Sequence, residues 1–193
     1  MMKKQSIYNI PNLLSFYRLL MFPVIMYFIL WGKESLFAIF LFINLVTDVL
    51  DGWIARAFDQ QTELGARLDS MADNLTYLLA ILGILVFKRQ DFAPHLTSFL
   101  IFAGLLFLTI VISLIKFRRF ASLHLYSFKI GGYIQGAFFA LLFAYGFVEP
   151  FYYFMITWGI LAALENIIVQ LYVRRLKSNA KGLYWVIKEN SRK

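Results

Sequence analysis

The chain has 193 residues, of which 61% are hydrophobic and only 16% are charged, and its mean hydropathy is +0.68. Because soluble domains carry about 25% charged residues, this composition excludes an ordinary soluble domain and predicts an integral membrane protein. The absence of cysteine excludes disulfides and thiolate metal sites. In a membrane protein the formal net charge of +8 reflects topology and anionic lipid, so no nucleic-acid partner is expected.

Six apolar stretches follow one another along the chain, separated by short connections. A transmembrane helix needs about 20 mostly apolar residues. In chain order the predicted spans cover residues 12–31, 34–57, 69–87, 96–115, 128–147 and 151–172, followed by a basic tail, residues 173–193. The sequence therefore predicts an all-α integral membrane protein with six transmembrane helices, forming one domain over residues 1–193.

The distribution of positive charge predicts how these spans are oriented. With the N-terminus inside, all 19 lysines and arginines except Lys33, Lys88 and Arg89 fall on the inner side. The positive-inside rule therefore predicts that both termini face the cytoplasm. The tail mixes basic and apolar residues, so it either lies on the anionic inner leaflet or forms a solvated, frayed end.

Four aspartates lie at helical spacing around the turn between the second and third spans. Asp48 and Asp51 are three residues apart and share one helical face, and Asp69 and Asp73 are four residues apart and share another. The two helices are antiparallel neighbours joined by a loop over residues 58–66. All four carboxylates are therefore expected within about two turns of the cytoplasmic boundary, where they form a single site.

Four carboxylates in a medium of low dielectric need cations to balance them. Oxygen ligands without histidine or cysteine suit the hard ions Mg²⁺, Mn²⁺ and Ca²⁺. Two such ions neutralise four aspartates, and a two-metal oxygen site is typical of displacement at phosphorus. A purely structural role as helix caps explains one or two aspartates, but not all four at this spacing.

Small residues and one arginine lie among the aspartates. Gly52, Ala55 and Gly65 leave the helix surfaces open to a ligand, although small residues also serve helix packing in membranes. Arg56 is suited to hold a phosphate.

This stretch resembles the signature of the CDP-alcohol phosphatidyltransferase family, D-x2-D-G-x2-A-R-x8-G-x3-D-x3-D. It matches at every fixed position: Asp48, Asp51, Gly52, Ala55, Arg56, Gly65, Asp69 and Asp73. The resemblance implies transfer of a phosphatidyl group from CDP-diacylglycerol to an alcohol with release of CMP. It implies that Asp48, Asp51 and Asp69 bind two Mg²⁺ or Mn²⁺ ions, and that Asp73 is the general base and also a ligand. The implied contacts to cytidine and phosphate are Gly52, Ala55, Arg56 and Gly65.

The resemblance also implies the protein's surroundings. The family resemblance implies a protein of the cell (inner) membrane, which the chain crosses several times. It also implies that the active site faces the cytoplasm and that the protein is a homodimer. The reaction belongs to phospholipid biosynthesis.

The first span suggests which alcohol is the acceptor. NIPNLLSFYRLLMFP (9–23) resembles the opening of phosphatidylglycerophosphate and cardiolipin synthases, in which Asn12 and Arg18 match and Ser15 stands where threonine is common. Glycerol 3-phosphate is therefore the first-choice acceptor. Asn74 stands where those synthases have lysine, and LDSMAD (68–73) resembles phosphatidylserine synthases. Serine, inositol, inositol phosphate and phosphatidylglycerol stay open as alternatives.

Basic residues between the fourth and fifth spans are candidates for binding an anionic acceptor. They are Arg118, Arg119 and Lys129, and the alternative is ordinary positive-inside charge. Glu165 and Asn166 are polar deep within the sixth span, where they are expected to pair across a dimer or a helix contact.

Two other classes of function compete with an enzyme. A cation transporter favours carboxylates near the membrane midplane, whereas these aspartates lie toward one face. A non-catalytic scaffold predicts that Asp73→Asn leaves function intact.

Overall fold

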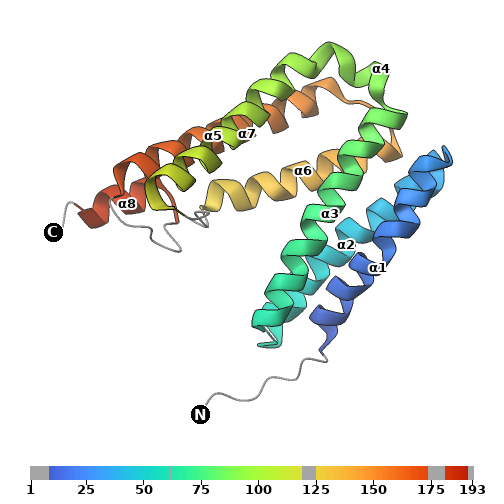
Figure 1. Cartoon of the computed structure of the whole chain (residues 1–193), viewed down its shortest axis with the longest axis horizontal. Coiled ribbons are helices and arrows are strands. Elements are labelled where there is room, and N and C mark those ends of the chain that lie inside the picture. Colours follow the sequence, from blue (N-terminus) through green and yellow to red (C-terminus); the bar gives the residue numbers. More distant parts are fainter. Residues whose placement is uncertain (1–8, 61, 119–124, 174–180, 191–193) are drawn as a thin grey trace. The chain divides into compact units, whose positions relative to one another are not determined.

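The computed structural model describes residues 9–60, 62–118, 125–173 and 181–190, and the regular structure within them is entirely helical (Figure 1). The helices are α1 (Ile10–Leu30), α2 (Glu34–Ala57), α3 (Glu63–Phe87), α4 (Arg89–Phe92), the 3-10 helix η1 (Ala93–His95), α5 (Leu96–Phe117), α6 (Tyr126–Ala144), α7 (Glu149–Tyr172) and α8 (Leu183–Asn190). Six stretches of the described residues are long and apolar enough to cross a membrane. The predicted all-α membrane fold with six spans is confirmed.

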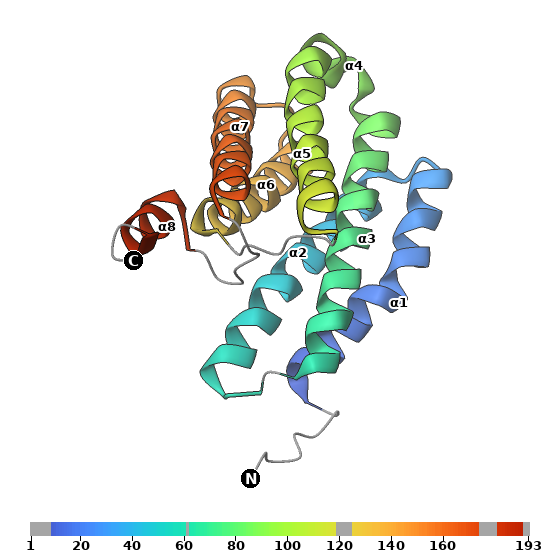
Figure 2. The ribbon, with the colours of Figure 1, turned by 60° about the vertical axis from the view of Figure 1, so that its left-hand side comes forward.

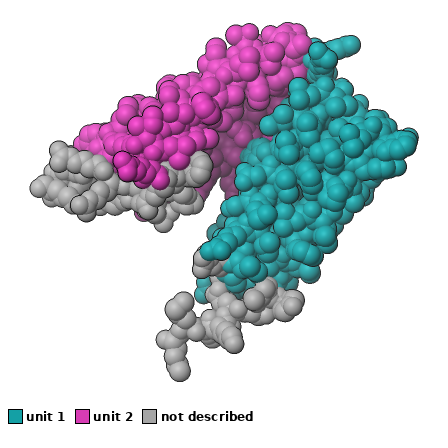
Figure 3. Space-filling model, in the orientation of Figure 1, with its two compact units in different colours: residues 1–91, 143–145 teal, residues 92–142, 146–193 magenta. Residues whose placement is uncertain are grey.

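The chain divides into two compact units, coloured separately in Figure 3. The first comprises residues 1–91 and 143–145, and therefore contains α1, α2, α3 and the four motif aspartates. The second comprises residues 92–142 and 146–193. The single domain over residues 1–193 stays a prediction.

In the first unit α1 packs against both α2 and α3 (Figures 1 and 2). The helix is capped by Asn9, whose side chain accepts the backbone N–H of Asn12 at 2.9 Å. Pro11 fits the first turn because no helical partner exists there for a backbone N–H. The buried side chains of α1 are polar near its start and apolar near its end: Asn12, Ser15 and Arg18, then Ile25 and Ile29. The start of α1 therefore presents a polar face to its neighbours.

The connection between α2 and α3 is shorter than the predicted loop over residues 58–66. Helix α3 begins at Glu63 rather than at residue 69, because the Thr62 side chain accepts the backbone N–H of Gly65 at 2.9 Å. Asp59 turns the chain with a left-handed φ of 56°. The added turns of α3 place Gly65 against Asn12 of α1.

In the second unit α5 packs against α7. Aromatic rings gather around Tyr152 at the start of α7, among them Phe92 and Phe147. The Tyr152 hydroxyl donates to the backbone oxygen of His95 at 2.9 Å.

Helix α6 ends at Ala144, before the predicted end of its span at residue 147, and Gly146 has a φ of 114° that favours glycine.

The tail helix α8 packs against α7. Its contacts include a buried apolar cluster of Leu125, Val169, Val173 and Val186. The Glu165 carboxylate accepts the backbone N–H of Leu183, at the first residue of α8, at 2.9 Å. It also accepts the Ser127 hydroxyl of α6 at 2.5 Å. Residues 183–190 are therefore docked and are not a frayed end, while contact with the inner leaflet stays a prediction.

The polar residues of the sixth span thus have partners within the chain. Glu165 joins α6, α7 and α8, and the Asn166 side chain accepts from Gln170 at 2.6 Å within α7. Of the two expected kinds of pairing, the structure describes the helix contact.

Candidate functional site

The four motif aspartates come together in the first unit. Asp48 and Asp51 lie on α2, and Asp69 and Asp73 lie on α3. One carboxylate oxygen from each of Asp48, Asp51 and Asp69 lies within 4.8 Å of the others. Asp73 belongs to the same cluster because it shares an ion-pair partner with Asp48. The helical spacing predicted this convergence correctly.

The shared partner is Arg18, on α1. Its Nη1 donates to Asp48 at 2.6 Å and to Asp73 at 2.7 Å. Its Nη2 donates to Asp51 at 2.7 Å and to Asp69 at 2.6 Å. The guanidinium is a planar fork of N–H donors that suits such paired contacts. One arginine therefore joins all four carboxylates and the helices α1, α2 and α3.

The members of this cluster differ sharply in burial. The Arg18 side chain is 0% exposed and that of Asp51 is 4% exposed. The side chains of Asp48, Asp69 and Asp73 are 40%, 41% and 38% exposed. The cluster thus has a closed side, formed by α1, and an open side from which an ion or a substrate can reach the carboxylates.

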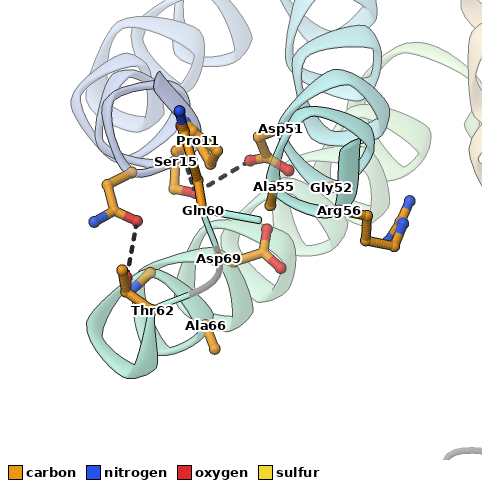
Figure 4. Close-up of a pocket in the computed structure, with 12 residues that line it drawn as sticks. Pro11, Ser15, Asp51, Gly52, Ala55, Arg56, Gln60, Thr62, Ala66 and Asp69 are labelled. Atoms are coloured by element: carbon orange, nitrogen blue, oxygen red, sulfur yellow. Dashed lines mark hydrogen bonds between the residues drawn. The ribbon is translucent and has the colours of Figure 1, made fainter. Parts of the chain in front are cut away.

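A cavity of about 250 Å³ lies beside the cluster (Figure 4). Figure 4 shows the side chains of Ser15, Asp51 and Asp69 around it, and the Ser15 hydroxyl donates to Asp51 at 3.1 Å. The lining residues are Pro11, Asn12, Ser15, Asp51, Gly52, Ala55, Arg56, Gln60, Thr62, Gly65, Ala66 and Asp69. Typical ligand pockets measure about 300–1,000 Å³, so this cavity suits the polar head of a ligand rather than a whole lipid.

Two glycines of the motif, Gly52 and Gly65, line this cavity, and a side chain at each would meet different neighbours. Among the described residues, a Cβ on Gly52 would meet only the flexible guanidinium of Arg56, at 3.4 Å, so the space beside Gly52 is open to a ligand group. A Cβ on Gly65 would collide with the Asn12 side chain and lie 2.8 Å from Thr62 Oγ1. Gly65 therefore has a packing role between α1 and α3 in addition to its place in the cavity wall.

The predicted cytidine and phosphate residues all lie in this wall. Ala55 and Arg56 come from the last turns of α2, as Gly52 does, and Gly65 comes from the first turn of α3. Their roles toward a ligand stay predictions, but their common location is what those roles require.

The sequence motif does not predict every residue of the site. Ser15 and Arg18 contact the carboxylates, and Gln60 and Thr62 line the cavity. The sequence holds one signal for this contact: the polar residues Asn12, Ser15 and Arg18 follow one another at intervals of three and so lie on one side of the helix. Polar residues on one face of an otherwise apolar span predict a polar neighbour.

The predicted acceptor-binding residues belong to the second unit or lie outside the described residues. Arg118 follows α5 with a left-handed φ of 54° and is exposed. Lys129, in the first turn of α6, is exposed, and its Nζ lies 5.7 Å from the centroid of the Tyr126 ring. Arg119 lies outside the described residues. An acceptor pocket at these positions stays a prediction.

The donor set of the cluster fits a hard divalent cation. It consists of carboxylate oxygens alone, the ligands that Mg²⁺ and Mn²⁺ prefer. Three of the four aspartates are partly exposed, so an ion has access. A cationic group of the protein already lies among the carboxylates, which shows that this position accepts positive charge.

Comparison with known proteins agrees with the motif. The family model of the CDP-alcohol phosphatidyltransferases matches residues 8–169. The chain belongs to this family. CDP-alcohol phosphatidyltransferases are known to use divalent metal ions, which agrees with the cluster of carboxylates described above.

Several curated members of the family are similar to the chain. It is 38% identical over 87 residues to a CDP-diacylglycerol–glycerol-3-phosphate 3-phosphatidyltransferase of Aquifex aeolicus, over 45% of the chain and 48% of the relative. It is 33% identical over 120 residues to a cardiolipin synthase (CMP-forming)/mitochondrial hydrolase fusion protein of Schizosaccharomyces pombe, over 62% of the chain and 19% of the relative. It is 31% identical over 95 residues to CDP-diacylglycerol–inositol 3-phosphatidyltransferase 1 of Arabidopsis thaliana, over 49% of the chain and 40% of the relative.

The aligned part of the chain spans less than half the length of each of these relatives. No solved structure matches the chain.

Proposed function

We propose that this membrane protein transfers a phosphatidyl group from CDP-diacylglycerol to a small polar alcohol and releases CMP. The observation that carries the proposal is the convergence of Asp48, Asp51, Asp69 and Asp73 beside a cavity walled by the other residues of the family signature. Carboxylates that can hold divalent ions next to a cavity for a polar head are what phosphoryl displacement needs.

Glycerol 3-phosphate is the acceptor that we favour. Relatives from Aquifex aeolicus, Blochmanniella floridana and Pseudomonas fluorescens carry that acceptor in their names. The segment over residues 9–23, with Asn12 and Arg18, resembles the opening of phosphatidylglycerophosphate and cardiolipin synthases and supports the same acceptor. The Arabidopsis thaliana relative is named for inositol instead, so inositol remains the chief alternative.

Asp48, Asp51, Asp69 and Asp73 would hold two Mg²⁺ or Mn²⁺ ions, which when bound supply positive charge that offsets negative charge on the pyrophosphate and on the departing CMP. Arg56 lies in the cavity wall, where its guanidinium can bind a phosphate in a bidentate manner. Gly52 leaves room for that phosphate close to α2.

Asp73 is the proposed general base. The acceptor oxygen forms a bond to the phosphorus that carries the diacylglycerol, the bond from this phosphorus to CMP breaks, and the hydroxyl proton passes to Asp73. Its side chain is 38% exposed, so an acceptor can approach it. A carboxylate within hydrogen-bonding reach of the attacking hydroxyl is the geometry that general-base catalysis requires.

The proposal includes where the protein works. It lies in the cell (inner) membrane, with the aspartates facing the cytoplasm, where water-soluble acceptors are present. A homodimer is part of the proposal and is checked by light scattering of the protein in detergent.

The experiment is an assay of CMP release by the purified protein with CDP-diacylglycerol and Mg²⁺ or Mn²⁺. The acceptors are glycerol 3-phosphate, serine, inositol, inositol phosphate and phosphatidylglycerol, and the lipid products are identified by mass. We expect CMP release that depends on glycerol 3-phosphate and stops when EDTA is added. Release with a different acceptor would correct the substrate. No release with any acceptor, from protein that still binds Mn²⁺, would contradict the proposed activity.

A further inference from the structure

Arg18 has an arrangement that a simple structural ion pair does not need. Each terminal nitrogen bridges one aspartate of α2 and one of α3: Nη1 joins Asp48 to Asp73, and Nη2 joins Asp51 to Asp69. The same four carboxylates are the ones proposed to hold the divalent ions. The arginine and the ions therefore compete for the same four carboxylates.

We propose that Arg18 is a built-in counter-ion of the metal site. It holds the four carboxylates together when no divalent ion is bound, and it must give up some of its hydrogen bonds when ions bind. The inference rests on the proposed function, because it takes the four aspartates as the metal ligands.

The first support is electrostatic. Four carboxylates held this close repel one another when ionised, and a surrounding of low dielectric strengthens the repulsion. A buried charge is tolerated only with close partners. The Arg18 side chain is 0% exposed, and its four ion pairs measure 2.6–2.7 Å. The guanidinium thus offsets part of the repulsion in the cluster while the carboxylates compensate for its own burial.

The second support is steric. Arg18 contacts Oδ1 of Asp48, Asp69 and Asp73. It contacts Oδ2 of Asp51, the oxygen that also accepts the Ser15 hydroxyl. Divalent ions bind carboxylate oxygens directly, at about 2.0–2.6 Å. An ion at that distance from these oxygens would compete with the guanidinium for space and would repel its charge.

A third observation concerns the remaining nitrogen of the guanidinium. Arg18 Nε is buried and has no hydrogen-bond partner among the described residues. The guanidinium thus leaves one buried donor unsatisfied while both terminal nitrogens reach carboxylates. Leaving a buried donor unpaired is costly, so the position of the guanidinium is governed by the four carboxylates rather than by full satisfaction of its own donors.

Two roles for Arg18 make opposite predictions for metal binding. If Arg18 only positions the aspartates for the ions, its removal weakens metal binding. If it is a counter-ion that the ions must displace, its removal strengthens metal binding and destabilises the protein without metal. The affinity for Mn²⁺, measured apart from any turnover, separates the two roles.

The experiment is a Mn²⁺ titration of the full chain in detergent or nanodiscs, with free Mn²⁺ followed by its electron paramagnetic resonance signal. We expect Arg18→Gln to bind Mn²⁺ about tenfold or more tightly than the wild type, because one neighbouring positive charge has been removed. We also expect its Tm to be lower without metal and to rise more on adding Mn²⁺ than that of the wild type.

The matched control is Lys88→Gln. Lys88 follows the end of α3 in the same unit, and its Nζ pairs with Glu34 at 2.8 Å. This change removes one paired cation but touches none of the four aspartates, so the Mn²⁺ affinity should equal that of the wild type. If Arg18→Gln does not fold, Arg18→Lys replaces it. A lysine keeps the charge but cannot bridge four carboxylates. Fewer hydrogen bonds then oppose the ions, so we expect Mn²⁺ binding tighter than in the wild type, by a smaller factor than for Arg18→Gln.

Equal or weaker Mn²⁺ binding by the Arg18 variant would overturn the inference while leaving the metal site intact. Asp48→Asn is titrated alongside to test the site itself. A wild type that binds no Mn²⁺, or an Asp48→Asn variant that binds it equally well, would count against the proposed metal ligands and so against both proposals.

Discussion

At the scale of single residues, the aspartates of the cluster are chemically alike but differ in their surroundings. Asp51 is buried, with a side chain that is 4% exposed, and it accepts hydrogen bonds from both Arg18 and Ser15. The Asp73 side chain is 38% exposed and accepts a hydrogen bond from Arg18. Asp48 and Asp69 are 40% and 41% exposed, like Asp73. Burial therefore separates Asp51 from the other three aspartates, and the role of Asp73 as base is tested by substitution.

The assignment of Asp73 as general base leads to a prediction for Asp73→Asn. The amide can still accept a hydrogen bond from Arg18, so we expect the cluster to stay assembled. It cannot take a proton at neutral pH, so CMP release should fall by about 10²–10⁴-fold, the usual contribution of a general base. Turnover and Mn²⁺ affinity are measured on the same preparation, and the affinity should change far less than the turnover.

Asp91→Asn is a suitable control, because Asp91 is an exposed residue of α4 and belongs to neither the cluster nor the cavity wall. It should turn over like the wild type. If Asp73→Asn kept near-normal turnover, the base would have to be another group. Asp48→Asn differs from Asp73→Asn in the expected result, because it should weaken Mn²⁺ binding as well as turnover.

At the scale of elements, the site depends on how closely α1 approaches α3. Asn12 joins the two helices, because its side-chain oxygen accepts the Thr62 hydroxyl at 3.2 Å. Thr62 in turn caps α3 through the N–H of Gly65. The same few residues therefore begin α3, hold the start of α1 and form one wall of the cavity.

Gly65→Ala is expected to disturb this approach. The added methyl group would collide with Asn12 Oδ1 and press on Thr62 Oγ1. Overpacking of this kind costs about 1–3 kcal/mol, so we expect a lower Tm together with reduced CMP release. The control is Gly104→Ala in α5, where no atom of the described residues lies within 4 Å of the new Cβ. The Tm values of the two variants are compared by thermal unfolding. Equal values would show that Asn12 and Thr62 can move aside for the added methyl group without loss of stability.

At the scale of the whole molecule, the prediction concerns which side of the membrane each connection faces. The chain has no cysteine, so single cysteines report position without background. Asp59→Cys, between α2 and α3, should react with a membrane-impermeant maleimide only from the cytoplasmic side. Lys33→Cys, between α1 and α2, should react only from the opposite side. The reverse pattern in intact and inverted vesicles would contradict the predicted orientation and place the aspartates on the outer face.

Local patterns in the sequence were enough for much of the fold and part of the site. Long apolar stretches predict spans because a helix must cover the hydrocarbon thickness. Spacings of three and four residues predict shared faces because the helix repeats every 3.6 residues. These two rules gave six spans, the pairs Asp48 with Asp51 and Asp69 with Asp73, and their convergence. The sequence motif alone also identified the family, which the match over residues 8–169 confirmed.

Local patterns failed where a capping side chain or a turn set the boundary. Helix α3 begins six residues before its predicted start, because the Thr62 cap extends it. The tail gave two possibilities, and the docking of α8 onto Glu165 of α7 ruled out a frayed end for residues 183–190. The sequence of the tail does not show that its helix begins against Glu165, because this contact joins a backbone N–H to a side chain 18 residues away.

What the sequence by itself determined is which residues share a helix face and which stretches can cross a membrane, because both depend on neighbours within a few residues. The tertiary structure alone decided that Arg18 lies among four aspartates that are 30–55 positions away in the chain. It also decided that Gly65 meets Asn12, on another helix. Such contacts depend on how three helices pack and rotate against one another, and packing is set by all of their side chains together.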